Sequence, residues 1–148
     1  MRKGFTLVEL LIVLAVIAAL MAVATPMALN AVATAKASQT AQNMANIASA
    51  IQTAYAVNGL PKDSTAAASK TYLAGYISTF PDGYEMAIDT GSKSSAAATI
   101  VYLLNDPAVD AIMKQNPQVQ KMAPGNIKGF TGLTAANYAV IVIPLISY

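Results

Sequence analysis

The distribution of charged and apolar residues divides the chain into two parts. Residues 10–35 contain no charged side chain and are mostly apolar. About 20 mainly apolar residues are enough for a helix to cross the hydrocarbon core of a bilayer, so this segment predicts a single membrane-spanning helix. Arg2 and Lys3 precede it, and basic residues at one end of such a helix hold that end in the cytoplasm. The rest of the chain is then expected on the other side of the membrane.

The helical pattern continues beyond the apolar segment but becomes two-sided. Between Met27 and Val57, apolar residues recur at steps of three and four, the spacing of one face of an α-helix. This face consists of Met44, Ile47, Ile51, Ala54 and Tyr55. Residues 58–61 then bring a glycine and a proline, which is typical of a helix end. We therefore expect one helix up to Asn58, whose second half covers a folded domain.

The remainder of the chain predicts a small antiparallel sheet. Residues 84–89 alternate between apolar and polar side chains, 98–104 predict a partner strand, and the polar segment 90–95 favours a turn between them. Residues 138–146 predict a further strand, in which Pro144 favours an edge or terminal position. The expected fold class is α+β: a long N-terminal helix with a protruding apolar half, packed against this sheet.

Other segments outside the strands predict loops and one short helix. Residues 60–83 are rich in small and polar side chains and predict a long surface loop, with helix at 66–76. Asp106 and Pro107 predict the start of a short helix that ends near residue 116. A glycine-rich loop is expected at 124–132.

The composition excludes most catalytic chemistry. The chain has no Cys, and its sequence contains no His and no Trp, which removes thiolate and imidazole metal sites, Cys nucleophiles and Ser-His-Asp triads. Its seven acidic residues are scattered, and no pair has the spacing for glycosidic or metal chemistry. We expect no catalytic residue, no metal site and no cofactor, and therefore no enzyme.

The charge balance gives little support for nucleic-acid binding. The formal net charge is +2, and Arg2 and Lys3 account for it. A basic patch could form from Lys114, Lys121 and Lys128. Because Asp106 and Asp110 lie beside these lysines in the sequence, a solvated surface is the better interpretation. A body without net charge instead suits a subunit that packs against copies of itself.

The N-terminal residues form a recognisable motif. Residues 4–10, with the sequence Gly-Phe-Thr-Leu-Val-Glu-Leu, follow a short basic leader and precede the apolar segment. This arrangement resembles the class III signal of type IV pilins and of the related type II secretion pseudopilins. The resemblance implies cleavage between Gly4 and Phe5 by a prepilin peptidase, N-methylation of the Phe5 amine, and assembly into a helical filament. An ordinary signal peptide cleaved after Ala24 is the alternative, since residues 22–24 have the small-x-small pattern.

Glu9 is the predicted assembly residue. An ionised carboxylate at the start of an apolar segment is costly unless it has a partner. Cleavage after Gly4 would create a cationic amine on Phe5, one helical turn away, and the pair could form within one chain or between staggered chains. The family resemblance favours pairing between Glu9 and the Phe5 amine of a neighbouring subunit. Pro26 removes one helical hydrogen bond and predicts a kink, with local melting implied by the resemblance.

These observations predict the organisation and the partners of the chain. We expect a leader peptide at 1–4, a transmembrane and filament-core helix at 5–29, and a pilin globular domain at 30–148. The expected function is that of a structural subunit of a type IV pilus, first held in the inner membrane and later in an extracellular filament. The resemblance implies a homo-oligomer and contacts with prepilin peptidase and the assembly machinery. A periplasmic pseudopilin of a type II secretion system is the first alternative, and a secreted binding domain is the second.

Overall fold

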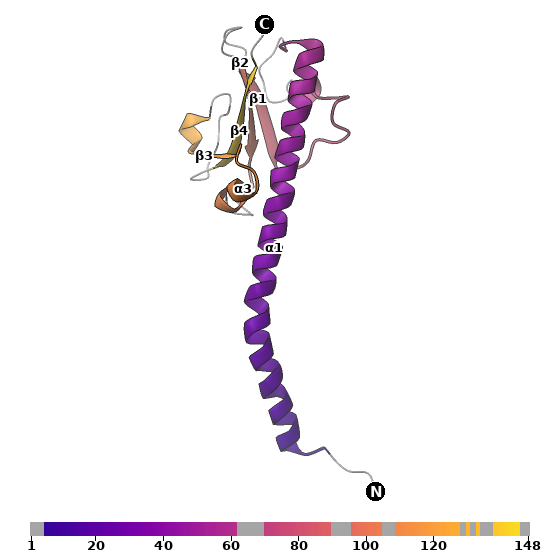
Figure 1. Cartoon of the computed structure of the whole chain (residues 1–148), viewed down its shortest axis with the longest axis vertical. Helices are drawn as coiled ribbons and strands as arrows, with labels where there is room; N and C mark the ends of the chain where they lie inside the picture. The colour runs from indigo at the N-terminus through magenta and orange to yellow at the C-terminus, as the bar shows by residue number, and fades with distance from the viewer. Residues whose placement is uncertain are drawn as a thin grey trace. The chain divides into compact units, whose positions relative to one another are not determined.

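The computed structural model describes residues 5–61, 70–89, 96–104, 109–127, 130, 133 and 138–145. The chain divides into two compact units, residues 1–35 and residues 36–148, and each is described by itself. Helix α1, Leu7–Asn58, begins in the first unit and ends in the second (Figure 1). The predicted helix and its end at Asn58 are thus confirmed, whereas the predicted domain division between residues 29 and 30 stays a prediction.

The first unit is an apolar helical segment without buried side chains. Every described residue from Phe5 to Ala35 is exposed, and the exposed fraction reaches 78% for Leu7. A contiguous exposed apolar surface of this kind marks a site of contact with a membrane or with other protein chains. The first unit therefore needs an apolar environment that its own described residues do not supply.

The second unit builds its core on the amphipathic part of α1. Met44, Ile47, Ile51 and Ala54 are all at most 1% exposed, which confirms the predicted apolar face. Tyr55 is only partly buried and packs against the edge of the core. The helix ends at Asn58, and the next residue, Gly59, has a φ of 70°, the left-handed conformation that favours glycine. Its N–H donates to the Tyr55 carbonyl at 2.9 Å.

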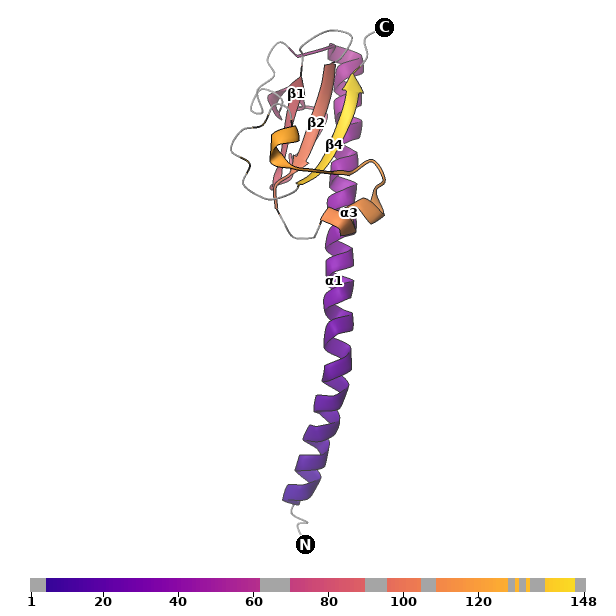
Figure 2. The same cartoon turned by 90° about the vertical axis from the view of Figure 1, so that its left-hand side faces the viewer.

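A four-stranded antiparallel sheet packs against this helical face. Its strands lie in the order β1-β2-β4-β3 (Figures 1 and 2). The strands are β1 (Tyr84–Asp89), β2 (Ala96–Tyr102), β3 (Gln120–Met122) and β4 (Tyr138–Leu145). Together with α1, this sheet confirms the predicted α+β fold class.

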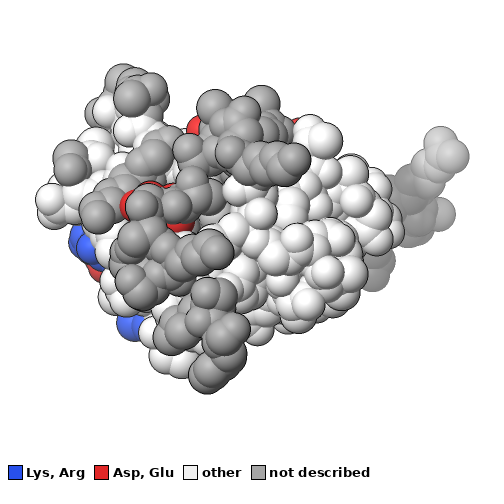
Figure 3. Space-filling model, turned by 90° about the horizontal axis from the view of Figure 1, so that it is seen from above, with Lys and Arg blue, Asp and Glu red and all other residues white. Residues whose placement is uncertain are grey.

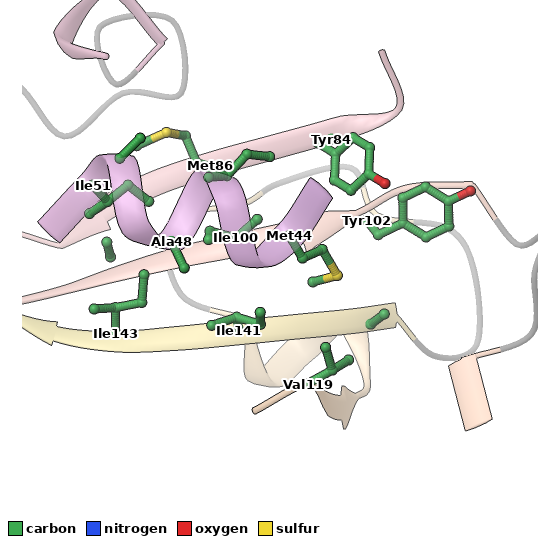
Figure 4. Packing of buried hydrophobic residues seen from close by; sticks show 14 of the residues in the cluster. Met44, Ala48, Ile51, Tyr84, Met86, Ile100, Tyr102, Val119, Ile141 and Ile143 are labelled. Atoms are coloured by element: carbon green, nitrogen blue, oxygen red, sulfur yellow. The ribbon is translucent and has the colours of Figure 1, made fainter. Parts of the chain in front are cut away.

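The register of the sheet aligns its apolar residues in rows that face α1. Met86 lies opposite Ile100, and Ile100 lies opposite Ile141. Figure 4 shows these three side chains together with Met44, Ala48 and Ile51 of α1. The opposite face of the sheet, which is turned toward the viewer in Figure 2, carries a smaller apolar cluster. That cluster consists of Val101, Ile127, Tyr138 and Val140.

Some predicted boundaries differ from the observed ones. Strand β2 begins and ends two residues earlier than predicted, because Ala96 and Ala97 pair with β1 or β4 although they are not typical strand residues. Strand β3 was not predicted, since it has only three residues and most of them are exposed. Pro144 lies at the next-to-last position of β4, which confirms its predicted terminal position in the strand, although β4 is an interior strand of the sheet.

The short elements are also partly as expected. Helix α3, Val109–Gln115, confirms the predicted short helix, while its predicted start at Asp106 and Pro107 lies outside the described residues. Residues 70–72 are helical, in agreement with part of the helix predicted at 66–76, and 66–69 are outside the described residues. A 3₁₀ turn, Pro124–Asn126, occupies part of the predicted glycine-rich loop.

Candidate functional site

The start of α1 is closed by reciprocal hydrogen bonds between Thr6 and Glu9. The backbone N–H and the hydroxyl of Thr6 each donate to Glu9 Oε2 at 2.8 Å. In return, the Glu9 backbone N–H donates to Thr6 Oγ1 at 3.3 Å. This arrangement is a capping box, which satisfies backbone N–H groups that have no partner within the first helical turn.

Thr6 was not predicted as a functional residue, although the sequence contains the signal for it. A Thr followed three residues later by Glu, directly before an apolar run, is the pattern of a capping box. The only predicted partner of Glu9 was the Phe5 amine. The structure adds Thr6 to the candidate site as the residue that holds the Glu9 carboxylate at the helix start.

The capping box leaves room for a further partner of Glu9. Both donors of Thr6 reach the same carboxylate oxygen, Oε2, and an ionised carboxylate has about four acceptor positions. A cationic amine could therefore add to the carboxylate without displacing Thr6. The cap and a charge pair with a Phe5 amine are compatible, and both would reduce the cost of placing Glu9 at the edge of an apolar segment.

The predicted cleavage position lies directly before this cap. Phe5 is 73% exposed, and neither Phe5 nor Thr6 is helical. Gly4 lies outside the described residues. Cleavage before Phe5 would leave every helical residue of α1 in place, because α1 begins at Leu7.

The apolar part of α1 contains hydroxyl groups that bond to their own helix. Thr25 Oγ1 donates to the Met21 carbonyl at 2.8 Å, and Thr34 Oγ1 donates to the Asn30 carbonyl at 2.9 Å. Such bonds remove the cost of placing a hydroxyl in an apolar environment. Pro26 lies inside α1, and its predicted role as a kink stays a prediction. By length and composition α1 is suited to cross a membrane.

One lysine of the considered basic patch is paired with a carboxylate. Lys121 Nζ lies 3.2 Å from Asp110 Oδ1. Lys128, the third member of the considered patch, lies outside the described residues. On the face shown in Figure 3, charged side chains occupy few places and most of the described surface is uncharged. No cluster of metal-ligating side chains occurs among the described residues.

Comparison with known proteins identifies the N-terminal segment. Residues 1–25 match the family model described as the prokaryotic N-terminal methylation motif. No curated protein and no solved structure matches the chain. The match covers the predicted leader, the capping box of Thr6 and Glu9, and most of the apolar segment. It confirms the resemblance on which the sequence analysis relied, and it implies processing by a prepilin peptidase. The chain therefore carries at its N-terminus the class III signal of type IV pilin and pseudopilin precursors.

Proposed function

We propose that this protein is a structural subunit of a type IV pilus without catalytic activity. In this proposal the precursor is held in the inner membrane, cleaved between Gly4 and Phe5, methylated at the Phe5 amine and polymerised into a helical filament. The observation that carries the proposal is the combination of the methylation motif at 1–25 with an apolar helical segment that is exposed throughout.

The exposed segment supports the two successive environments of the proposal. A bilayer covers the apolar side chains before assembly, and apolar helices of other copies cover them in the filament. Burial of apolar surface contributes about 25 cal/mol per Å², so a segment of this size can drive both states. Because the bilayer and the filament both cover these apolar side chains, burial alone does not determine how the subunits align. Assembly therefore requires a further feature that selects the register of the subunits.

Glu9 is the proposed register residue. Its carboxylate accepts two hydrogen bonds from Thr6 and keeps the capacity to accept a cation. In the filament that cation is the methylated Phe5 amine of a neighbouring copy. Removing one partner of a buried charge pair costs about 3–5 kcal/mol, and this cost would recur at every subunit.

The experiment that tests the proposal compares Glu9→Ala with a control that removes a carboxylate elsewhere. Glu85 of β1 lies in the second unit and is partly exposed, so Glu85→Ala is the matched control. We expect Glu9→Ala to be made, cleaved and retained in the inner membrane, but to give few or no filaments. Glu85→Ala should give normal filaments. Electron microscopy of sheared surface fractions measures the filament yield, and an immunoblot of membranes measures the protein that is retained there.

Two results would contradict the proposal. Normal filament yield from Glu9→Ala would remove the assembly role of the carboxylate. An intact mass that corresponds to a chain starting at Thr25 would show that an ordinary signal peptide had been removed. This result would support the alternative of a secreted binding domain. The same preparation distinguishes the pseudopilin alternative, because a pseudopilus stays in the periplasm and would be absent from the surface fraction.

A further inference from the structure

The second unit contains a polar cavity beside the first turns of its helix. The cavity has a volume of about 190 Å³ and lies between α1 and the paired ends of β1 and β2. Its lining combines a cation, a carboxylate, carboxamides and two phenol rings: Lys36, Gln39, Thr40, Asn43, Asp82, Tyr84, Tyr102 and Leu104. One water needs only about 10–15 Å³, so this cavity can admit a larger polar group.

Hydrogen bonds and ring packing fix one wall of the cavity. Tyr84 and Tyr102 are 4% and 6% exposed, and their ring centroids lie 5.0 Å apart. Asn43 Nδ2 donates to the Tyr84 phenol oxygen at 3.3 Å, and the Tyr84 hydroxyl donates to the Thr40 carbonyl at 3.4 Å. Figure 4 shows both rings beyond Met44, with their oxygens pointing away from the apolar cluster. The wall is therefore preorganised and presents polar atoms.

The position of Lys36 in the chain places this cavity where the apolar segment ends. Lys36 is the first charged residue after residues 10–35, so in a membrane-anchored chain it is the first cation to reach the headgroup region. Lysine side chains near the ends of membrane helices extend toward the interface, and tyrosines are enriched there. Leu104, which also lines the cavity, is 55% exposed and adds apolar surface beside the polar groups.

We propose that this cavity binds the headgroup of a phospholipid that carries a phosphate and a primary ammonium group. Lys36 would donate to the phosphate, and Asp82 would accept from the ammonium. Lys36 takes part in an interaction within the chain, but its ammonium has three donors, so a phosphate can be added. The inference rests on membrane anchoring of the chain and is independent of filament formation.

Native mass spectrometry of the full-length chain in detergent tests this proposal with three lipids. Phosphatidylethanolamine has both groups, phosphatidylcholine has no ammonium hydrogen, and phosphatidylglycerol has no ammonium. We expect the protein to bind phosphatidylethanolamine at least about fivefold more tightly than the other two, as one charge-assisted hydrogen bond allows.

Three variants separate the contributions of the two charged groups. Lys36→Gln should lower the affinity for all three lipids about tenfold, because each contains the phosphate. Asp82→Asn should lower only the affinity for phosphatidylethanolamine, to the level of phosphatidylcholine. Lys114→Gln removes the same charge from an exposed position of α3 and should change none of them. All three residues are exposed, so the variants are expected to fold, and circular dichroism checks this.

Other results would overturn the assignment. Equal binding of the three lipids, or equal effects of Lys36→Gln and Lys114→Gln, would show that the cavity has no headgroup selectivity. If glycerophosphoethanolamine, which has no acyl chains, binds as tightly as the lipid, the ligand is a soluble phosphate ester instead. If Lys36→Gln and Asp82→Asn bind lipids normally but lower filament yield, the cavity is a contact with a second copy.

Discussion

Glu9 is the only charged residue among the described residues of the first unit, and Thr6 is the residue that contacts its side chain. The carboxylate was predictable as a functional group because a charge at the start of an apolar segment is costly. Its hydrogen-bond partner, Thr6, could also be predicted, because it precedes Glu9 by three residues at the start of a helix. The two donors of Thr6 mean that Glu9 has a partner before any second copy arrives.

Thr6→Val separates the cap from the charge. The substitution removes the hydroxyl and keeps a β-branched side chain, and loss of a capping hydroxyl costs about 1 kcal/mol. This is less than the cost of an unpaired buried charge, so filament yield should fall less than for Glu9→Ala. Thr6→Ser keeps the hydroxyl and should retain the yield. Quantitative immunoblots of sheared filaments measure the series, with the cleaved fraction in membranes as the control. Equal losses for Thr6→Val and Glu9→Ala would mean that the cap itself controls assembly.

Tyr72 gives a pH dependence to the stability of the second unit. Its hydroxyl donates to the Gly59 carbonyl at 2.6 Å, and partial burial, with smaller effects of Tyr76 and Tyr55, raises the pKa of the phenol. A raised pKa means that the neutral phenol stabilises the fold fully below the ordinary tyrosine pKa of about 10. This contribution is lost as the pH rises above that value.

The measurement compares the unchanged protein with Tyr72→Phe. The Tm difference between them should be constant from pH 7 to about 9 and should shrink above about pH 10, because the variant has already lost the bond. Using the difference cancels the titration of the other tyrosines and of the lysines. A difference that grows with pH would show that the phenolate, not the phenol, is favoured in the folded protein.

At the scale of elements, segments with a periodic pattern, including the short helix α3, were predictable, whereas the three-residue strand β3 was not. The apolar face of α1 and the alternation of β1 follow from the sequence because each has a regular repeat over several residues. Strand β3 has no such repeat, and it forms because Gln120, Lys121 and Met122 pair with Val140, Ala139 and Tyr138. The cavity beside Lys36 could not be predicted either, since residues 36–43 of α1 and residues of β1 and β2 meet there only in three dimensions.

The two faces of β4 predict different responses to substitution. Ile141 is 2% exposed and belongs to the core between the sheet and α1, whereas Val142 is 39% exposed. Ile141→Ala should lower the free energy of unfolding by about 2–5 kcal/mol through lost burial and a cavity. Val142→Ala should cost about 1 kcal/mol or less. Urea unfolding followed by circular dichroism measures both. Similar losses at the two positions would mean that Val142 is buried in solution.

At the scale of the whole molecule, the two units should behave as proteins of different solubility. The first unit exposes apolar side chains throughout, while the second has its own core. We expect the full-length chain, after removal of residues 1–4, to require detergent to stay dispersed. A chain that starts at Asn30 should be monomeric in plain buffer. Analytical ultracentrifugation with and without detergent measures this difference. A full-length chain that stays monomeric without detergent would remove the driving force for assembly.

At this scale, the function could be predicted only from the part of the chain that carries a motif of consecutive residues. Residues 1–25 carry a linear motif in which order and spacing are sufficient, so the precursor class could be identified without a structure. The lining of the cavity beside Lys36, by contrast, comes from three separate stretches of the sequence, within residues 36–43, 82–84 and 102–104.

The position of β4 after the other three strands in the sequence also sets the order in which folding can be completed. Strand β4 pairs with β2 from Ala139 to Leu145 and supplies Ala139, Ile141, Ile143 and Leu145 to the core that covers α1. Until those residues have been synthesised, β2 lacks one neighbour and the helix lacks part of its cover. Long-range pairing of this kind is formed late. The sheet and its cover of α1 can therefore be completed only after β4 has been synthesised, later than the other three strands.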